Sequence, residues 1–346
     1  MDVLKNIALL SSWIDEANTI TTVCHSRPDG DAAGSSAAMA AYLRDCRDKD
    51  VVSLVPDPVP DTVRFVLEGL NCCEDPDSVR DRLSRTDLLI CLDFNTFSRV
   101  EGYTELLRES PARKVLIDHH EEPDTEAFGI CISDTRVSSA CELLYRVLLA
   151  MPDIDGDATR LPSAALRALM TGMTTDTNNF SNSVYPGTLG MASDLLAAGV
   201  DRDDIIDRLY RSERPNRLSA MGEMLSSRMV LLPCGAAVTV LPKNFYERHA
   251  LMDGETEGFV NLPLAIKNIR LSVLAKEDNG VFRISVRSKR GVSARMLAKR
   301  FFHGGGHEQA SGGKILMPQD IELASEAEAY VCDITARFMQ DQAGFE

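Results

Sequence analysis

Short apolar runs that end in histidine or aspartate recur through the first half of this chain, and they constrain its fold more than any other feature. Their nearly continuous apolar character indicates strands that are buried on both faces. Helical stretches separate them, which is typical of a mostly parallel sheet with helices on both sides. The expected fold class is therefore α/β. We expect strands at residues 19–24, 51–55, 88–92 and 115–117, and helices at 34–45, 137–151 and 161–173.

The length of 346 residues predicts more than one domain, because a single core rarely grows beyond about 250–300 residues. Three segments are expected: a parallel-sheet domain at 1–190, a helical linker at 191–232 and a smaller α/β domain at 233–346. In the smaller domain, Asn279-Gly280 is typical of a hairpin turn. The remaining elements expected there are strands at 238–241, 271–275 and 282–286, and helices at 293–302 and 320–338.

The net charge of −15 is distributed unevenly. Residues 267–314 contain eleven lysines and arginines against three acids, which is a net +8 and leaves −23 for the rest of the chain. An acidic body suits a cationic metal centre, whereas a basic segment suits an anion-binding surface or, more simply, a solvated face. The overall acidity argues against wrapping of long DNA, which requires many phosphate contacts.

The sequence also argues against a membrane protein, because no apolar run approaches the ~18 residues that a membrane span requires. The acidic N-terminal stretch indicates an amphipathic helix rather than a signal peptide. The nine cysteines are scattered and include no CxxC pair. They indicate reduced thiols and a cytoplasmic protein rather than a disulfide framework.

The first polar group follows the first expected strand and contains His25, Asp29 and Asp31. Pro28 and Gly30 let the chain turn, so that the imidazole and both carboxylates can point into one space. These ligand types suit Mn, Fe, Co or Zn better than Ca or Mg. The alternative is a solvated turn with an internally satisfied histidine, because this sequence is a common turn composition.

Three further polar groups follow apolar segments. Asp93 ends an expected strand, where a helix-capping role is the alternative. Asp118-His119-His120 follows a buried strand, and three ionisable groups there are costly to arrange for structure alone. Asp176 follows a helix, where a turn residue is the alternative. Ligands bind outside the carboxyl ends of parallel strands, so these groups are expected to form one site for two divalent metals.

At this spacing, the four groups resemble the pattern of the DHH phosphoesterase superfamily, and the resemblance extends over nearly the whole chain. The sequence GGGHEQASG, which starts at Gly304, is similar to the glycine-rich signature of a DHHA1 domain. The chain is thus most similar to the stand-alone branch that carries both domains. The type members of that branch are the NrnA-type oligoribonucleases and pAp phosphatases.

This resemblance implies a role for each residue of the first domain. The implied metal ligands form two sets that share Asp93: His25, Asp29 and Asp93 for the first ion, and Asp31, Asp93, His119 and Asp176 for the second. His120 would contact the substrate phosphate, and Asp118 would orient the histidines. The implied cofactors are two divalent ions, Mn²⁺ by resemblance, since the general order of metal affinities would favour Cu or Zn.

The resemblance assigns substrate binding to the second domain. Arg287-Ser288 matches a position that contacts substrate in relatives, and consecutive glycines allow backbone N–H groups to approach an anion closely. Without the His and Ala-Ser-Gly that follow, an ordinary loop would be the better interpretation of the glycines. The implied substrate-binding residues are Arg287, Ser288, Gly304, Gly305, Gly306 and His307.

The function that the resemblance implies is metal-dependent hydrolysis of short oligonucleotides, of 3′-phosphoadenosine 5′-phosphate (pAp), or of both, by a hydroxide generated between two ions. A phosphodiesterase for cyclic or linear dinucleotides, with the same residues, is one alternative. An exopolyphosphatase or pyrophosphatase is another, although such relatives lack the glycine-rich signature. A nucleic-acid-binding protein with a decayed site is the third, although every implied ligand is present. The expected partner is a short RNA or nucleotide, without a membrane, and a homodimer is left open.

Overall fold

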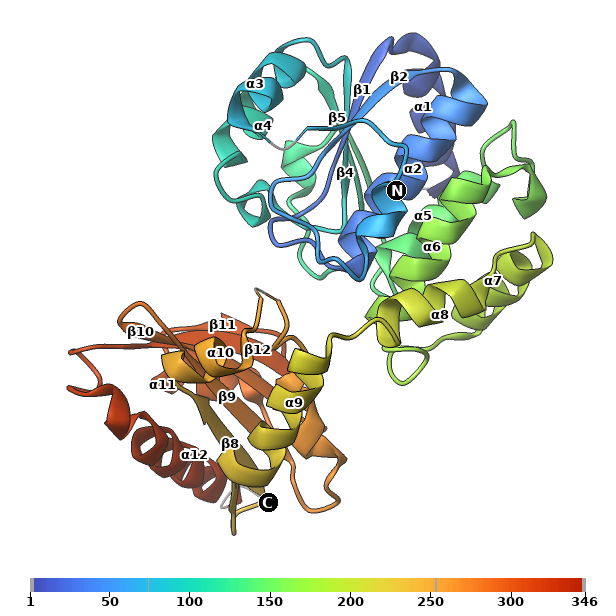
Figure 1. The fold of residues 1–346 in the computed structure, drawn as a ribbon. Helices are drawn as coiled ribbons and strands as arrows, with labels where there is room; N and C mark the ends of the chain where they lie inside the picture. Colours follow the sequence, from blue (N-terminus) through green and yellow to red (C-terminus); the bar gives the residue numbers. More distant parts are fainter. Residues whose placement is uncertain (1–2, 74, 253, 344–346) are drawn as a thin grey trace. The chain divides into compact units, whose positions relative to one another are not determined.

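The computed structural model describes residues 3–73, 75–252 and 254–343 (Figure 1). Residues 1–2 and 344–346, at the outer ends of the two expected domains, lie outside the described part, as do residues 74 and 253. The chain divides into two compact units, Met1–Ser212 and Glu213–Glu346. The boundary between the units falls inside the segment 191–232, where we expect a helical linker.

A six-stranded parallel sheet forms the centre of the first unit, with the strand order β3-β2-β1-β4-β5-β6. β1 lies between β2 and β4. The sheet therefore extends from β1 through β2 and β3 on one side and through β4, β5 and β6 on the other. The fold class expected from the sequence is confirmed. The strands are β1 (Thr19–Val23), β2 (Asp50–Leu54), β3 (Cys72–Cys73), β4 (Leu88–Leu92), β5 (Arg113–Asp118) and β6 (Ile130–Ser133).

Helices cover both faces of this sheet, because alternate residues of its strands are apolar on both sides. In β4, Leu88, Ile90 and Leu92 join one buried cluster, whereas Leu89 and Cys91 join another on the opposite face. The helices α1 (Val3–Glu16), α2 (Gly30–Arg47), α5 (Ala140–Leu149), α6 (Ser163–Asp176), α7 (Pro186–Ala197) and α8 (Arg202–Tyr210) belong to the first cluster. The helices α3 (Pro76–Ser84) and α4 (Thr104–Glu109) belong to the second.

The second unit contains a mixed six-stranded sheet with the order β11-β12-β10-β9-β8-β7, in which only the β8–β9 pair is parallel among the described strands. α11 (Ala294–Phe301) and α12 (Ala327–Ala343) pack on one face, and α9 (Pro215–Glu223) and α10 (Lys243–His249) on the other. The strands are β7 (Met229–Leu232), β8 (Ala236–Leu241), β9 (Leu271–Asp278), β10 (Val281–Ser288), β11 (Gly305–Gly306) and β12 (Ala310–Leu316).

The hairpin turn expected at Asn279-Gly280 joins β9 to β10, and both residues have positive φ, as a tight hairpin requires. Other elements differ from expectation. The last helix begins at Ala327 rather than near residue 320, because residues 317–326 form turns and a single 3₁₀ turn. Asp176 is the final residue of α6 rather than part of the following loop.

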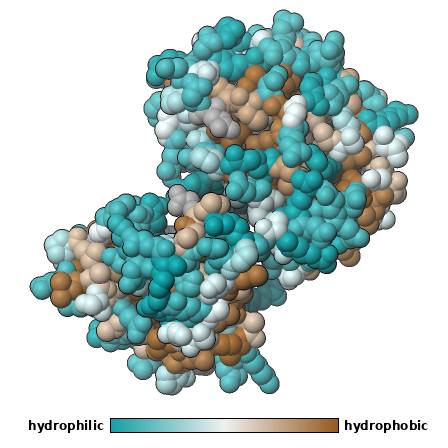
Figure 2. Space-filling model, in the orientation of Figure 1, coloured by the Kyte–Doolittle hydropathy of each residue, from teal (hydrophilic) through white to brown (hydrophobic). Residues whose placement is uncertain are grey.

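No helix among the described residues is long and apolar enough to cross a membrane. On the face shown in Figure 2, hydrophilic side chains cover most of both units, and apolar patches are interrupted by polar ones.

Candidate metal centre

All six expected metal ligands lie at the carboxyl ends of neighbouring strands or on the helices beside them. His25 follows β1, Asp93 follows β4, and His119 follows β5. Asp31 stands in the first turn of α2, which packs against α6, and α6 ends at Asp176. The strand order reverses between β1 and β4, because the strands before β4 lie on one side of β1 and the strands from β4 onward lie on the other. Open α/β sheets bind ligands at the carboxyl ends of the strands at such a point.

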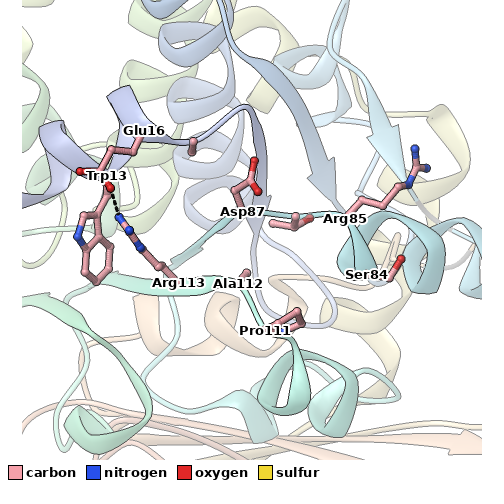
Figure 3. Close-up of a pocket in the computed structure, with 10 residues that line it drawn as sticks. Trp13, Glu16, Ser84, Arg85, Asp87, Pro111, Ala112 and Arg113 are labelled. Atoms are coloured by element: carbon pink, nitrogen blue, oxygen red, sulfur yellow. Dashed lines mark hydrogen bonds and ion pairs between the residues drawn. The ribbon is translucent and has the colours of Figure 1, made fainter.

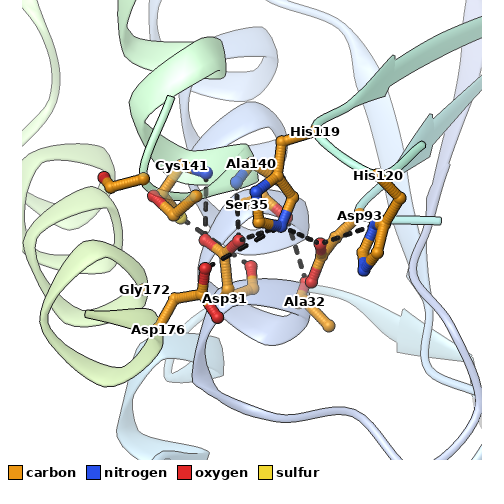
Figure 4. Close-up of polar contacts among 12 residues, drawn as sticks. Asp31, Ala32, Ser35, Asp93, His119, His120, Ala140, Cys141, Gly172 and Asp176 are labelled. Atoms are coloured by element: carbon orange, nitrogen blue, oxygen red, sulfur yellow. Dashed lines mark hydrogen bonds and ion pairs between the residues drawn. The ribbon is translucent and has the colours of Figure 1, made fainter. Parts of the chain in front are cut away.

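Three overlapping groups of side chains each have ligand atoms within 4.8 Å of one another. Figure 4 shows the two groups that contain His119. The groups are His25 with Asp29 and Asp93, Asp31 with His119 and Asp176, and Asp93 with His119 and His120. Asp93 belongs to two of the groups and therefore lies at the centre of the arrangement. The first two groups together contain every residue that the resemblance implies as a ligand.

Asp93 has an unusual backbone and an unusual carboxylate. Its φ of 63° lies in the left-handed region, which costs energy for a residue other than glycine. One carboxylate oxygen, Oδ2, lies 3.6 Å from His25 Nε2, and the other, Oδ1, lies 3.4 Å from His119 Nε2. Oδ1 is buried and accepts no hydrogen bond from the residues that the structure describes. A buried acceptor without a partner is costly, and a cation would satisfy it.

The neighbouring ligands are oriented by hydrogen bonds that leave coordinating atoms available. His25 Nδ1 lies 2.9 Å from the carbonyl oxygen of Ser26, so this nitrogen carries the proton and Nε2 faces Asp93. Asp29 caps α2: one of its carboxylate oxygens accepts from the amides of Asp31 and Ala32. The remaining oxygen of Asp29 can contribute to a metal.

Asp31 is held by the N-terminus of α5. Its Oδ2 accepts from the amide of Ala140 at 2.6 Å, and its Oδ1 accepts from the amide of Cys141 at 2.9 Å. The buried Glu142 fixes this helix start, because its Oε2 accepts from the Ser138 amide and hydroxyl. This support could not be identified from the sequence, since backbone amides leave no signal in a motif.

Asp118 is fully buried and orients one histidine of the pair that follows it. Its Oδ1 accepts from His120 Nδ1 at 2.7 Å, and its Oδ2 accepts from the His120 amide at 3.2 Å. We expect Asp118 to orient both histidines, and the structure shows this contact for His120. His119 instead points its Nε2 toward three carboxylates, those of Asp31, Asp93 and Asp176.

The carboxylates and imidazoles perturb one another strongly. Burial, reinforced by neighbouring carboxylates, raises the pKa of Asp31 to about 7 and that of Asp176 to about 8. Burial opposes protonation of the histidines, but Asp93 outweighs it and raises the pKa of His25 to about 9 and of His119 to about 10. The residues therefore fit a divalent cation, whose charge would replace these protons.

We expect Mn²⁺ binding to release protons, because Asp31, Asp176 and His119 retain protons near neutral pH and must lose them to coordinate. The apparent affinity should rise from about pH 6 to about pH 9, by about tenfold per pH unit for each proton displaced. Calorimetric titrations in buffers of different ionisation enthalpy would count the released protons. An affinity that does not change with pH would contradict the raised pKa values of Asp31, Asp176 and His119.

The substrate-binding residues expected in the second unit have mixed surroundings. Arg287 on β10 is half-buried, and its Nη1 donates to the Val286 carbonyl at 3.0 Å. Burial lowers the pKa of Arg287. Ser288 is buried, and its hydroxyl donates to the Val292 carbonyl at 2.6 Å, so its side chain supports the following turn.

The glycine run forms the short edge strand β11 rather than an open loop. A Cβ at Gly304 would overlap the Gly312 carbonyl oxygen, and Gly306 has a φ of 138°. Close packing against β12 therefore requires two of the glycines, whatever they bind. Gly305 has open space around it, and the backbone of His307 closes a turn with Ala310.

A cavity of about 540 Å³ lies at the opposite end of the strands of the first sheet, beside the start of β4 and β5 (Figure 3). Its charged groups have partners within the protein: the Arg113 guanidinium lies over the Trp13 ring and pairs with Glu16, and Asp87 accepts from the Asn18 and Thr19 amides. None of the expected ligands lines this cavity. It therefore has the contacts of a structural corner rather than of a reactive site.

Comparisons with known proteins agree with this arrangement. The family model "DHH family, N-terminal domain" matches residues 19–173, and the "DHHA1 domain" model matches residues 237–331. A solved exopolyphosphatase-related protein from Bacteroides fragilis has 31% sequence identity and a TM-score of 0.90, with 98% of each chain covered. The chain belongs to the DHH family.

Two curated proteins are similar over most of the DHH chain. Each is a "bifunctional oligoribonuclease and PAP phosphatase NrnA". The protein from Bacillus subtilis is 26% identical over 86% of this chain and 90% of its own length. The protein from Thermus thermophilus is 29% identical over 87% and 85%. This DHH protein is a hydrolase that acts on phosphoester bonds.

Proposed function

We propose that this DHH phosphoesterase hydrolyses short RNA oligonucleotides and pAp, with two Mn²⁺ ions held by the six ligands. The observation that carries the proposal is the position of Asp93, whose two oxygens face two different groups of ligands. Similarity to the NrnA proteins in both domains supports the choice of substrate.

The proposed division of ligands places His25, Asp29 and Asp93 on one ion, and Asp31, Asp93, His119 and Asp176 on the other. When bound, the ions would supply Lewis acidity for the phosphoryl oxygens and lower the pKa of a coordinated water. His and Asp ligands suit Mn²⁺, and Asp93 lies where a carboxylate can bridge.

His120 supplies the remaining chemistry that the structure supports. The buried Asp118 carboxylate accepts a hydrogen bond from Nδ1 of His120 and fixes the orientation of the ring, so that Nε2 can face a phosphoryl oxygen. His120 is also close enough to Asp93 and His119 to be a metal ligand, so its role needs a separate test.

The substrate assignment is tested by hydrolysis with Mn²⁺ of a panel of compounds: pAp, a short RNA, a cyclic dinucleotide, pyrophosphate and a long RNA. We expect turnover of pAp and of the short RNA, with little activity on pyrophosphate or long RNA. Preferred turnover of the cyclic dinucleotide would support the phosphodiesterase alternative instead.

Replacement of His120 by alanine is expected to keep the metals and slow turnover by about 10²–10³-fold, which is the usual cost of losing one transition-state donor. Elemental analysis of the purified variant, together with kcat on a short RNA, separates the two roles. Loss of one ion per chain in this variant would make His120 a ligand.

A further inference from the structure

A buried carboxylate outside the expected ligand set follows directly after the amides that hold Asp31. Glu142, in the first turn of α5, is fully buried, and several donors converge on its Oε2. The Ser138 amide donates at 2.9 Å, the Ser138 hydroxyl at 2.6 Å and the Thr188 hydroxyl at 2.7 Å. Its other oxygen, Oε1, accepts from the Arg146 guanidinium. The proposed hydrolysis does not use this carboxylate, although the fold supplies donors to both of its oxygens.

The contacts of Glu142 differ from those of an ordinary capping box. Ser139 is the N-cap residue of α5, and its hydroxyl accepts from the Glu142 amide at 2.9 Å. In a capping box, a glutamate at this position would accept from the amide of the N-cap residue. Glu142 instead accepts from Ser138, one residue earlier. Its carboxylate therefore fixes how the chain enters α5, and the first two amides of the helix are directed at Asp31 (Figure 4).

The same carboxylate connects α5 to α7. Thr188, whose hydroxyl donates to Glu142, is buried in the first turn of α7. A Cβ at Gly187 would lie 2.7 Å from Glu142 Oε1, so α7 begins directly against this carboxylate. The segment 177–185 joins this helix start to Asp176, the last residue of α6. Glu142 thus also fixes the far end of the segment that follows Asp176.

We propose that Glu142 is a positioning residue for only one of the two ions. That ion is the one assigned above to Asp31, Asp93, His119 and Asp176. The inference rests on the proposed function, which divides the ligands between two ions. Glu142 acts on the two carboxylates that belong to this ion alone, on one through the start of α5 and on the other through the start of α7. Among the described residues, its hydrogen bonds reach neither His25 nor Asp29, the ligands exclusive to the other ion.

This position requires a carboxylate rather than an amide of the same shape. Burial raises the pKa of Glu142, but hydrogen bonds from Ser138 and Thr188 outweigh it and lower the pKa, so the side chain is ionised at neutral pH. If the oxygen of a glutamine faced these donors, its NH₂ would face the Arg146 guanidinium, which is also a donor. In the reversed orientation, the NH₂ would face the Ser138 amide, which cannot become an acceptor. Glu142→Gln therefore loosens both helix starts without a change in volume.

Calorimetric titration of the EDTA-treated full chain with Mn²⁺ tests the proposal without any turnover. We expect Glu142→Gln to weaken one ion by about ten- to a hundredfold, the usual effect of removing a group that orients a ligand. The other Kd should stay within about threefold, as expected of a site whose ligands the substitution does not reach.

Asp194→Asn is the matched control. Asp194 of α7 accepts from the Tyr145 hydroxyl of α5 at 2.9 Å, so it joins the same two helices away from the helix starts. Both Mn²⁺ affinities should stay within about twofold in this variant, because no contact to Asp31 or Asp176 depends on it. Thr188→Val is a second variant, which keeps the carboxylate and removes its contact to α7. It should weaken the same ion as Glu142→Gln, by about two- to tenfold.

The Asp31→Asn background identifies which ion depends on Glu142. This substitution removes a ligand of the second ion only and should leave one ion bound. The ion that Glu142 supports is then absent, so adding Glu142→Gln should change the remaining Kd by less than about threefold. A further tenfold loss in the double variant would place the effect of Glu142 on the other ion and overturn the inference.

Unchanged affinities in Glu142→Gln, equal weakening of both ions, or equal effects of Glu142→Gln and Asp194→Asn would also overturn it. Equal weakening would indicate a general charge effect, and equal variants would indicate only packing between α5 and α7. If the natural chain binds a single ion and Glu142→Gln weakens it, the two-ion function fails while the positioning role stands. A natural chain that binds no Mn²⁺, or a single ion that Glu142→Gln does not weaken, would count against both.

Discussion

Replacement of Asp93 by alanine is expected to remove both metals and to lower hydrolysis by more than about 10³-fold. Its two carboxylate oxygens face different ligand groups, and Oδ1 accepts no hydrogen bond from any described residue, so one substitution disturbs both ions. A smaller loss, of about 10²–10³-fold, is usual for a single electrostatic contact. Mn²⁺ content by elemental analysis and kcat/KM on a short RNA measure the two effects.

Asp93→Asn is the matched control for the backbone. Asparagine tolerates the left-handed φ of 63° as aspartate does, but it lacks the negative charge. The variant should therefore fold normally and still lose metal. Two tightly bound ions and near-normal turnover in either variant would refute the assignment of Asp93 as the bridging ligand.

Replacement of Gly172 by alanine is expected to destabilise the first unit and to disturb metal binding together. A Cβ at this position of α6 would overlap Cys141 Sγ and lie 2.8 Å from Asp31 Oδ1. Overpacking of this kind costs about 1–3 kcal/mol, although alanine in a helix normally gains up to about 1 kcal/mol over glycine. Chemical denaturation and Mn²⁺ titration would show both changes.

Gly190→Ala is the matched control in the same unit, and its expected effect on the free energy of unfolding has the opposite sign. Gly190 lies within α7, and a Cβ added there would meet no heavy atom of the described residues within 4 Å, so only the helix propensity changes. We expect this variant to be more stable by about 0.5–1 kcal/mol, with unchanged metal binding. If Gly172→Ala behaved like Gly190→Ala, the close contact between α2 and α6 would not support Asp31.

The fold of the first unit could be predicted from its strands because buried parallel strands are nearly uniform in apolar character. β1, β4 and β5 therefore stand out in the sequence, and the residues after them mark the site. The short edge strands β3 and β6 could not be predicted, since two to four residues carry too little periodicity. β12 could not be predicted either, because Gly312 and Gly313 interrupt its pattern.

The six candidate ligands could be identified from residue type and spacing, but their supports could not. The amides of Ala140 and Cys141 hold Asp31 through the backbone, and any sequence could supply them. A cavity of about 210 Å³ in the second unit, lined by Lys276, Ser285 and Arg287, could not be predicted either, because polar side chains on a sheet face resemble an ordinary solvated surface. Glu257 and Asn261 reach it only through tertiary packing.

The left-handed backbone of Asp93 and the crowded carboxylates around it have a thermodynamic consequence for the whole first unit. Both features cost free energy in the folded state, and a cation that binds only the folded state compensates for them. By mass action, each tenfold rise in free Mn²⁺ above its Kd adds about 1.4 kcal/mol per bound ion to the free energy of unfolding. The melting temperature of this unit should therefore rise with the concentration of free Mn²⁺ around the protein.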